Sequence, residues 1–461
     1  MSALGSKLML ARAIGRVLRA SGRGGGTSLP GEFLLRLEPA ALGELANRLS
    51  GGVTVISATN GKTTTAAMAA AVLERAGHEL VYNRAGANMA GGVAAALLAA
   101  TRARGRMDGD TGLFEVDEFW LGAVCDQLRP GSLLLANLFR DQLDRYGELE
   151  MIADRWAEVV RALPAASALV LNADDPLVAD LGRERANTTY FGVDDAAVAL
   201  PEMQHAADSK HCRRCGSPYR YDVVYMGHLG DYHCPGCGQA RPRPAVQARA
   251  ITLHGTSAAS FTLVSGSLSQ AVTIPLPGLY NVYNALAATA LCLALGVPLE
   301  LIADGLEHTA AAFGRAETVT LGERTILIML VKNPAGANEI LRTLVLEDEQ
   351  LDVLAVLNDN TADGRDVSWI WDADFELLGP RLRSITCAGT RAAELAVRLK
   401  YAGVPAAAIS VIPAVARALD HALTQSRGAR LFALPTYTAM LALREELVRR
   451  GASTPYWQLE R

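Results

Sequence analysis

Short apolar segments rich in β-branched residues recur along the chain and alternate with longer helical patterns. The first, 53–57, stops at a polar turn, and an alanine-rich pattern with helical spacing follows from about Thr63. Strands separated by helices predict a parallel sheet covered on both faces, and hence an α/β fold. The further strands predicted in this way are 133–136, 168–171, 325–330, 353–357, 384–388 and 430–434.

Two segments have features that could indicate contact with a membrane. The uncharged stretch 278–299 contains Asn281 and Asn284, and its apolar part, 285–297, is too short to cross about 30 Å of hydrocarbon, so it predicts a buried helix. Residues 1–26 predict an amphipathic helix with a basic face and no signal-peptide cleavage site. That helix either contacts an anionic membrane surface or packs on its own protein.

Length and composition describe an ordinary cytoplasmic globular protein. The 461 residues have room for about three domains, half of them are hydrophobic, and the net charge of −4 gives no support to nucleic-acid binding. We divide the chain into an N-terminal helical segment (1–45), a central domain (46–314) and a C-terminal α/β domain (315–461). Residues 205–243 break the α/β rhythm, because they are polar and rich in Cys, Gly, Pro and Tyr, and we interpret them as an insert in the central domain.

The turn after the first strand has the composition of a phosphate-binding loop. Gly61 lets the backbone approach an anion, and the free N–H groups at the start of the following helix point towards it. Lys62 can reach the β- and γ-phosphates of a nucleotide, and Thr63 can place its hydroxyl on Mg²⁺. We therefore predict that ATP binds to Thr59, Asn60, Gly61, Lys62, Thr63 and Thr64.

A carboxylate for the magnesium ion is predicted close to this loop. Glu115 follows the apolar pair at 113–114 and should lie at the end of a strand. Mg²⁺ prefers oxygen ligands and usually binds through one or two carboxylates together with nucleotide phosphates, so Glu115 is the first choice. Asp117 and Glu118 are alternatives, unless they belong to a solvated loop.

Four of the seven cysteines form two Cys-x-x-Cys pairs within the insert, eighteen residues apart. This spacing is typical of a zinc ribbon in which four thiolates surround one Zn²⁺ ion and leave no open position for catalysis. The metal would stabilise a small insert that lacks a core of its own. The predicted ligands are Cys212, Cys215, Cys234 and Cys237, and a redox pair is the weaker alternative.

Four further motifs follow the phosphate loop along the chain: Asn137-Leu-Phe-Arg-Asp-Gln-Leu-Asp144, Leu171-Asn-Ala-Asp-Asp-Pro176, Gly278-Leu-Tyr-Asn-Val-Tyr-Asn284 and Gly314-Arg315. Their order resembles that in the Mur ligases and folylpolyglutamate synthases. The resemblance implies that Asn281 lies near adenine and that Arg315 reaches the terminal phosphate. Two features depart from the pattern: Gln142 replaces a metal-binding histidine, and no lysine between Lys62 and Lys210 could be carbamylated.

The C-terminal segments Lys332-Asn-Pro-Ala-Gly-Ala-Asn338 and 357–376 resemble the MurT family of Mur-ligase-type subunits. The resemblance implies ATP-dependent amidation of the D-glutamate α-carboxylate in the lipid II stem peptide, through an acyl phosphate, during peptidoglycan biosynthesis. A GatD-like class I glutaminase would form a heterodimer with the chain and supply ammonia. Asp366 would complete the Cys-His pair of that partner, although it could also cap a helix beginning near Ser368.

Two other functions remain open at this stage. A Mur-type amino-acid ligase or a folylpolyglutamate synthase-like ligase would need no glutaminase partner, but the cysteine insert and the Asp366 segment count against it. A non-catalytic nucleotide-binding scaffold would not need the Lys62–Thr63 pair together with Glu115.

Overall fold

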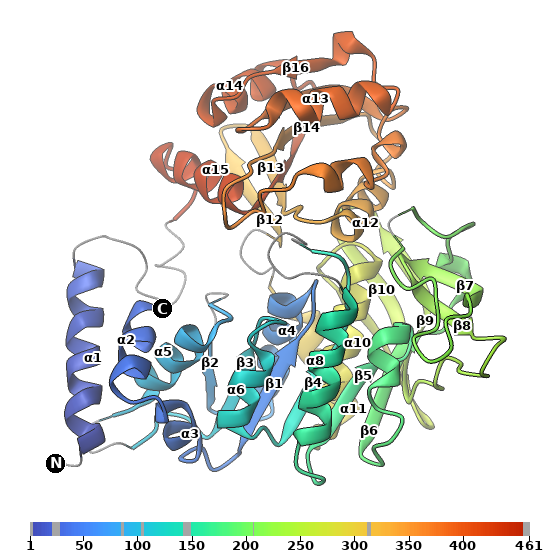
Figure 1. The fold of residues 1–461 in the computed structure, drawn as a ribbon. Helices are drawn as coiled ribbons and strands as arrows, with labels where there is room; N and C mark the ends of the chain where they lie inside the picture. The colour runs from blue at the N-terminus through green and yellow to red at the C-terminus, as the bar shows by residue number, and fades with distance from the viewer. Residues whose placement is uncertain are drawn as a thin grey trace.

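Two separate β-sheets organise the chain in the computed structural model (Figure 1). The structure describes residues 3–20, 28–83, 87–102, 106–141, 149–205, 207–310 and 315–454. The fold is α/β, as the sequence predicts, and no helix within these ranges is both long and apolar enough to cross a membrane.

The first sheet has nine strands in the order β11-β10-β9-β6-β5-β4-β1-β3-β2. The strands from β2 to β9 are parallel, whereas β10 and β11 extend the sheet as an antiparallel meander. The strands are β1 (Val53–Ser57), β2 (Leu80–Tyr82), β3 (Thr111–Glu115), β4 (Ser132–Leu135), β5 (Ala168–Asn172), β6 (Thr188–Val193), β9 (Val246–His254), β10 (Ala258–Ser265) and β11 (Leu268–Ile274).

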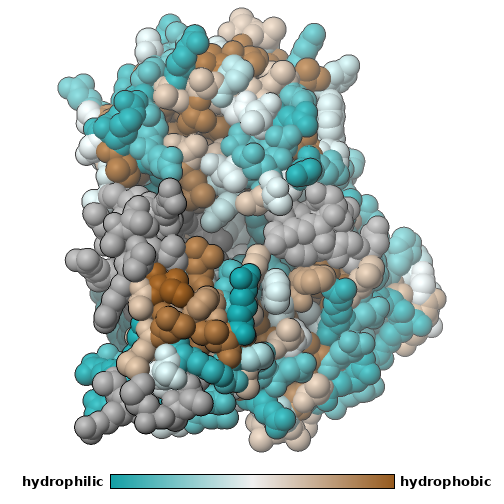
Figure 2. All heavy atoms as spheres, turned by 60° about the vertical axis from the view of Figure 1, so that its left-hand side comes forward, coloured by the Kyte–Doolittle hydropathy of each residue, from teal (hydrophilic) through white to brown (hydrophobic). Residues whose placement is uncertain are grey.

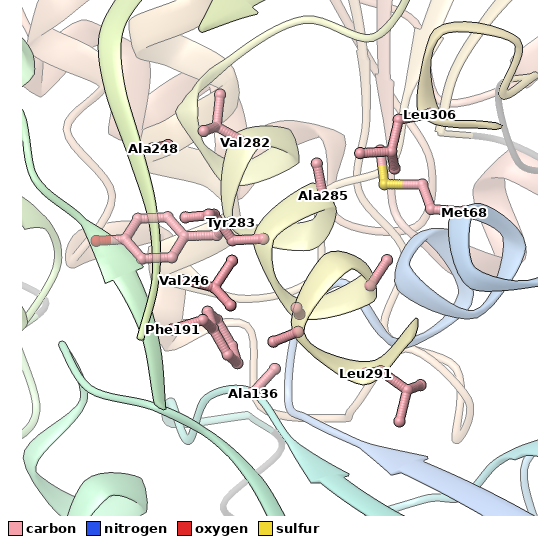
Figure 3. Packing of buried hydrophobic residues seen from close by; sticks show 14 of the residues in the cluster. Met68, Ala136, Phe191, Val246, Ala248, Val282, Tyr283, Ala285, Leu291 and Leu306 are labelled. Atoms are coloured by element: carbon pink, nitrogen blue, oxygen red, sulfur yellow. The ribbon is translucent and has the colours of Figure 1, made fainter. Parts of the chain in front are cut away.

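Helices cover both faces of this sheet, and its central strands β1, β3 and β4 are therefore buried along their whole length. The uncharged segment forms the buried helix α10, which packs against α4 and against strands from β4 to β10 (Figure 3). The remaining helices are α2 (Leu29–Leu37), α3 (Ala41–Ala46), α4 (Lys62–Arg75), α5 (Ala90–Ala100), α6 (Leu121–Leu128), α8 (Leu149–Ala162), α9 (Pro176–Asp180), η2 (Ala196–Val198), α10 (Leu279–Ala294) and α11 (Leu299–Glu307).

The N-terminal helix, α1 (Ala3–Ala20), packs on its own protein. It contacts α2 and α5, and its Leu8 and Ala11 side chains are buried. Lys7 pairs with Glu38 at 2.7 Å. The same helix leaves Met9 and Leu10 about half exposed, so its outer face stays available for another contact.

The cysteine-rich insert contains a two-stranded antiparallel sheet, β7 (Arg220–Met226) and β8 (Leu229–His233). The tip of this hairpin is anchored to the central domain, where the Gly230 N–H donates to the Asp174 carbonyl at 2.9 Å. Asp174 is fully buried and accepts hydrogen bonds from Arg241 and from the Tyr283 hydroxyl at 2.7 Å each. Arg241 also donates to the Val193 carbonyl at 2.7 Å, so the insert is fastened directly to β6 and, through Asp174, to α10.

The second sheet begins at Arg315 and has the strand order β12-β13-β17-β14-β15-β16. Only the β12–β13 pair is antiparallel. Its strands are β12 (Arg315–Leu321), β13 (Arg324–Met329), β14 (Leu351–Val356), β15 (Leu382–Ala388), β16 (Ile409–Val411) and β17 (Arg430–Pro435). Its helices are α12 (Pro334–Leu344), η3 (Ser368–Trp371), η4 (Phe375–Leu377), α13 (Ala392–Tyr401), η5 (Ala406–Ala408), α14 (Val415–Gln425) and α15 (Tyr437–Arg449).

Each of the seven strands predicted from apolar runs is confirmed within two residues at either end. The sequence did not reveal the strands β2, β6 to β12 and β16, and of β3 it placed only the end, at Glu115. The strands that were missed are partly exposed, so they lack the continuous apolar run that marks a strand buried on both faces.

Candidate functional site

Polar residues from three adjacent parallel strands meet at one edge of the first sheet. β1 pairs with β3 on one side and with β4 on the other, and the chain leaves the carboxyl end of each strand at this edge. Glu115 is the last residue of β3, and Asn137 follows β4. Such a switch point is where open α/β sheets place their ligand sites.

The loop after β1 has the geometry of an anion-binding turn. Gly61 has φ +86°, a left-handed conformation that a side chain disfavours, and a Cβ there would lie 2.0 Å from the Asn284 side-chain oxygen. The helix α4 starts at the next residue, so its free N–H groups face the loop. Thr63 is half-buried at the helix start, and Thr64 is buried.

Lys62 lies inside this loop rather than on the surface. Its ammonium group donates to the Ala58 carbonyl and approaches the Thr59 carbonyl at 3.5 Å. It also forms an ion pair with Glu118 at 2.7 Å, with both side chains about nine-tenths buried. An acidic group in the loop after β3 therefore pairs with the lysine inside the loop after β1.

The pKa values of the pair follow from this contact. Burial lowers the pKa of Lys62, but the charges of Glu118, Asp117 and Glu115 outweigh it and raise the pKa above its ordinary value. Burial raises the pKa of Glu118, but the Lys62 charge prevails and the pKa lies below its ordinary value. Both groups are therefore charged at neutral pH.

Glu115 and Asp117 lie beside the pair. Glu115 is 1% exposed, and its backbone N–H donates to Asn83, whose side-chain amide in turn donates to the Glu115 carbonyl. Asp117 and Glu118 are buried as well, so the alternative that these two residues belong to a solvated loop is excluded. The carboxylates and the Thr63 hydroxyl are hard oxygen donors, and this donor set suits Mg²⁺.

Two asparagines that follow strands hold the loop through paired contacts. The Asn137 side chain accepts from the Asn60 N–H at 2.9 Å and donates to the Asn60 carbonyl at 3.0 Å. The Asn60 side chain in turn exchanges two hydrogen bonds with Asn333, at 3.0 and 3.2 Å. Asn333 comes from the C-terminal domain, where its side chain caps the first turn of α12. The phosphate loop is thus held from both domains.

The asparagines of α10 support the loop from behind. The Asn284 oxygen accepts from the Thr65 hydroxyl at 3.3 Å, and its amide donates to Asn281 at 3.0 Å. Asn281 also donates to the Pro277 carbonyl at 2.7 Å. Both side chains are buried. Asn281 therefore reaches the loop through Asn284, the residue that touches Gly61.

A second ammonium group enters the site from the C-terminal domain. Lys332 donates to the Thr59 carbonyl at 3.2 Å and forms an ion pair with Asp141, which follows β4 and whose side chain is 7% exposed. Burial raises the pKa of Asp141 above its ordinary value, even though the Lys332 charge acts in the opposite direction. The sequence contained the Lys332-Asn333-Pro334 signal, but nothing in it indicated this partner.

Two of the residues named from the resemblance fall wholly or partly outside the described chain. Arg315 opens β12, and its side chain lies outside the described part of the structure, as does Gln142. Thr59 is buried, and its hydroxyl accepts from the Phe139 N–H at 3.1 Å.

The four cysteines of the insert gather as predicted. Their sulfur atoms all lie within 4.8 Å of one another. Each Cys-x-x-Cys pair is followed by a glycine in a left-handed conformation, Gly216 or Gly238, whose N–H donates back to the first cysteine's carbonyl at 2.8 or 3.0 Å. Such turns point two thiols towards one metal, so the group fits a tetrahedral Zn²⁺ ion.

The other three cysteines are core residues. Cys125, Cys292 and Cys387 are buried, and burial raises the pKa of Cys125 and of Cys387 to about 12. Their thiols are therefore protonated at neutral pH and have none of the activation that a nucleophile requires. The chain offers no glutaminase nucleophile among them.

Asp366 lies on the surface of the C-terminal domain. Its carboxylate accepts from the Ser368 N–H at 2.8 Å. Ser368 begins the 3₁₀ helix η3, whose N-cap position is Val367, so Asp366 contacts the first residue of this helix without being its N-cap residue. Hydrogen bonds from the Ser368 backbone and hydroxyl lower the pKa of Asp366. The residue is thus an exposed, oriented and ionised carboxylate.

Comparisons with known proteins agree with this geometry. The family models for the Mur ligase middle domain and the MurT ligase C-terminal region match residues 56–233 and 330–440. The chain is 33% identical over 444 residues to the MurT subunit of lipid II isoglutaminyl synthase (glutamine-hydrolyzing) from Streptococcus pneumoniae, with 96% of each chain covered. The Staphylococcus aureus MurT subunit is also 33% identical, with 95% of this chain and 97% of that protein covered.

A solved structure extends the likeness to the fold. The pseudomurein peptide ligase type C from Methanothermus fervidus superposes with a TM-score of 0.68 at 24% identity, covering 88% of this chain and 80% of that one. Fold, loop geometry and sequence identity over nearly the whole length lead to one assignment. The chain belongs to the MurT family of Mur-type ligases.

Proposed function

We propose that this chain amidates the α-carboxylate of D-glutamate in the lipid II stem peptide, giving D-isoglutamine at the expense of ATP. In the first step a carboxylate oxygen attacks the γ-phosphorus of ATP, the bond to the bridging oxygen breaks and ADP leaves. In the second step ammonia attacks the acyl carbon, phosphate leaves and the nitrogen loses a proton. Phosphorylation is needed because a carboxylate oxygen is otherwise a poor leaving group.

The observation that carries the proposal is the buried Lys62 ammonium at the N-terminus of α4, in a chain 33% identical to MurT subunits over almost its full length. Phosphoryl transfer depends on positioned cations and N–H groups more than on acid–base chemistry. A lysine fixed by Ala58 and Glu118 at the switch point is such a cation, and it exchanges Glu118 for a phosphate when nucleotide binds.

The remaining site residues take supporting roles in this proposal. Thr59, Asn60, Gly61, Thr63 and Thr64 surround the phosphates, Asn281 lies on the adenine side and Arg315 approaches the terminal phosphate. Thr63 and Glu115 hold Mg²⁺, which supplies charge neutralisation for the transferring group. The four-cysteine group holds a structural Zn²⁺ ion.

The ammonia comes, in this proposal, from a GatD-like class I glutaminase that binds the C-terminal domain. Support comes from the exposed Asp366 carboxylate, which can orient a histidine as the third member of a Cys-His-Asp set. Trp371, which is 52% exposed, follows Asp366 closely in the sequence, and Tyr401, which is 75% exposed, ends α13. Their rings lie edge to face, with the ring centres 5.7 Å apart. Large aromatic side chains of this kind are frequent anchors in protein interfaces.

Access to lipid II, a membrane-anchored substrate, is proposed to involve the α1 face at the cytoplasmic side of the plasma membrane. Figure 2 brings this side of the molecule forward and shows hydrophobic side chains gathered on it; Met9, Leu10 and Leu29 are each about half exposed. Co-sedimentation with anionic vesicles tests the contact, with a Met9→Ser/Leu10→Ser variant as the comparison. Equal binding of both proteins would contradict it.

The test of the function is reconstitution. The purified complex is given ATP, lipid II and either glutamine or ammonium chloride, and the stem peptide is analysed by mass spectrometry. Amidation with ammonium by the chain alone, and with glutamine only in the presence of the glutaminase, is the expected result. Ligation of an amino acid without a partner would identify an amino-acid ligase instead, and nucleotide binding without turnover a scaffold.

A further inference from the structure

Lys332 stands out because a lysine of the C-terminal domain lies inside the phosphate site of the central domain. Its ammonium group and that of Lys62 approach the same carbonyl oxygen, that of Thr59, at 3.2 and 3.5 Å. The two nitrogens therefore lie no further apart than the sum of these distances. Each is held by its own carboxylate, Lys62 by Glu118 and Lys332 by Asp141.

Two helix N-termini converge on the same place. The helix α4 begins at Lys62, and α12 begins beside Asn333, whose side chain is bonded to Asn60 in the loop. The free N–H groups at the start of α4 and the dipole of each helix favour negative charge at this end. Two ammonium groups and two helix N-termini around one loop are an arrangement that a polyphosphate would complete.

We propose that Lys332 is a second phosphate-binding cation, which leaves Asp141 for the γ-phosphate and stabilises the negative charge that develops as the phosphoryl group moves to the substrate carboxylate. The inference rests on the proposed ATP-dependent function and adds a residue to it. In this step the side chain exchanges one anion for another, and no proton is transferred.

The alternative is that Lys332 only fastens the two domains together through Asp141 and Thr59. The two roles differ in their dependence on the third phosphate. A fastening lysine contributes equally to the binding of ATP and ADP, because both require the same arrangement of domains. A lysine that binds the γ-phosphate contributes to ATP and hardly at all to ADP.

The experiment compares nucleotide affinities by calorimetry in the intact complex with its glutaminase, using a non-hydrolysable ATP analogue and ADP. For Lys332→Met we expect at least tenfold weaker binding of the analogue, on the order of one lost charged contact, and less than about threefold weaker binding of ADP. Acyl phosphate formation, trapped with hydroxylamine, should fall by about 100-fold or more. Lys332→Arg should recover part of both effects, because it keeps the charge.

Two further variants make the result decisive. Lys332→Met leaves the Asp141 side chain buried without its cation. The double variant Lys332→Met/Asp141→Asn removes this unpaired carboxylate, so it should recover the stability of the site. It should not restore the preference for ATP over ADP. Lys400→Met, an exposed lysine on α13, is the matched control and should behave like the wild type. Equal weakening of ATP and ADP, or recovery of acyl phosphate formation in the double variant, would overturn the inference.

The inference and the proposed function fail in different ways. If the wild-type complex amidates lipid II from ammonium while Lys332→Met binds the ATP analogue normally, the function stands and the role of Lys332 is wrong. If lipid II is not amidated but Lys332→Met still loses ATP selectively, the acceptor has been misidentified and the phosphate contact stands.

Discussion

Replacing Lys62 by methionine separates the two things that this side chain does. Methionine keeps much of the volume of the lysine stem but removes the charge that pairs with Glu118 at 2.7 Å. The variant therefore changes the phosphate site and at the same time strands a buried carboxylate. A loss of activity alone could have either cause, so the stability of the protein has to be measured with it.

The magnitude of the stability effect follows from burial. Both partners are about nine-tenths buried, and breaking a buried ion pair by removing one partner costs about 3–5 kcal/mol because the remaining charge is left without compensation. Replacing both partners by neutral groups costs much less and is often close to neutral. We therefore expect Lys62→Met to lower the unfolding free energy of the central domain by several kcal/mol, and Lys62→Met/Glu118→Gln to recover most of it.

The pH dependence of Lys62→Met carries a second signature. In the wild type the pKa of Glu118 is below its ordinary value of 4.5, so the pair stabilises the fold above that pH and the contribution is lost as pH falls through the lowered pKa. Without Lys62 the dominant remaining effect is burial, which raises the pKa of Glu118. The cost of the single variant should then shrink as the pH is lowered from 7 to 5, while the double variant should show no such trend.

The assay is urea unfolding at several pH values, combined with amidation of lipid II from ammonium. Both variants should lose amidation by about 10³-fold or more, because neither has the phosphate-directed cation. Arg75→Met, on α4, breaks an exposed ion pair with Asp304 of α11. It is a matched control and should leave stability within about 1 kcal/mol of the wild type. Recovery of amidation in the stable double variant would refute the assignment of Lys62 to phosphate, and an undisturbed stability of the single variant would refute the buried pair.

Three further predictions address other parts of the chain. Asp366→Asn should reduce glutamine hydrolysis by the complex by about 10²-fold or more while amidation from ammonium persists, and an equal loss of both would indicate a structural role. Cys215→Ser should lower the zinc content measured by mass spectrometry from one ion per chain and the melting temperature with it, whereas Cys387→Ser should leave one ion bound. Glu347 accepts two hydrogen bonds from Thr256 and pairs with Arg430, contacts that lower its pKa despite burial. Its contribution to stability should therefore be present above pH 4.5 and decline as pH falls through the lowered pKa, and Glu347→Gln, followed by thermal unfolding, should remove that pH dependence.

The sequence predicted those parts of the molecule that depend on local pattern. A strand buried on both faces is an unbroken apolar run, and β1, β4, β5, β13, β14, β15 and β17 were found in this way. The phosphate loop and the four-cysteine group are also local, because a few residues at fixed spacing create the turn that the chemistry needs. The uncharged helix α10 was interpreted correctly for the same reason.

The parts that could not be predicted depend on contacts between distant residues. Lys332 and Thr59 are 273 residues apart, and Asn284 and Thr65 are 219 apart. Each of these side chains also has an ordinary local interpretation as a cap or a solvated turn. Glu118 shows the difficulty well: it belongs to a polar segment after β3, and only the fold reveals that it is buried against Lys62.

The cysteine insert contacts both the C-terminal domain and the segment that follows β4. Arg342 of α12 donates to the Tyr225 carbonyl in β7 at 2.8 Å, and the segment before β7 is bound to Arg140 through Asp208. The insert therefore contacts both the segment after β4, which carries Asp141, and the helix that begins beside Lys332. The four thiols belong to the same insert, so we expect that removing their metal weakens these two contacts. In the mechanism that we propose, Lys62 and Lys332 face the same nucleotide, and the insert then helps to keep the central and C-terminal domains in the arrangement that this requires.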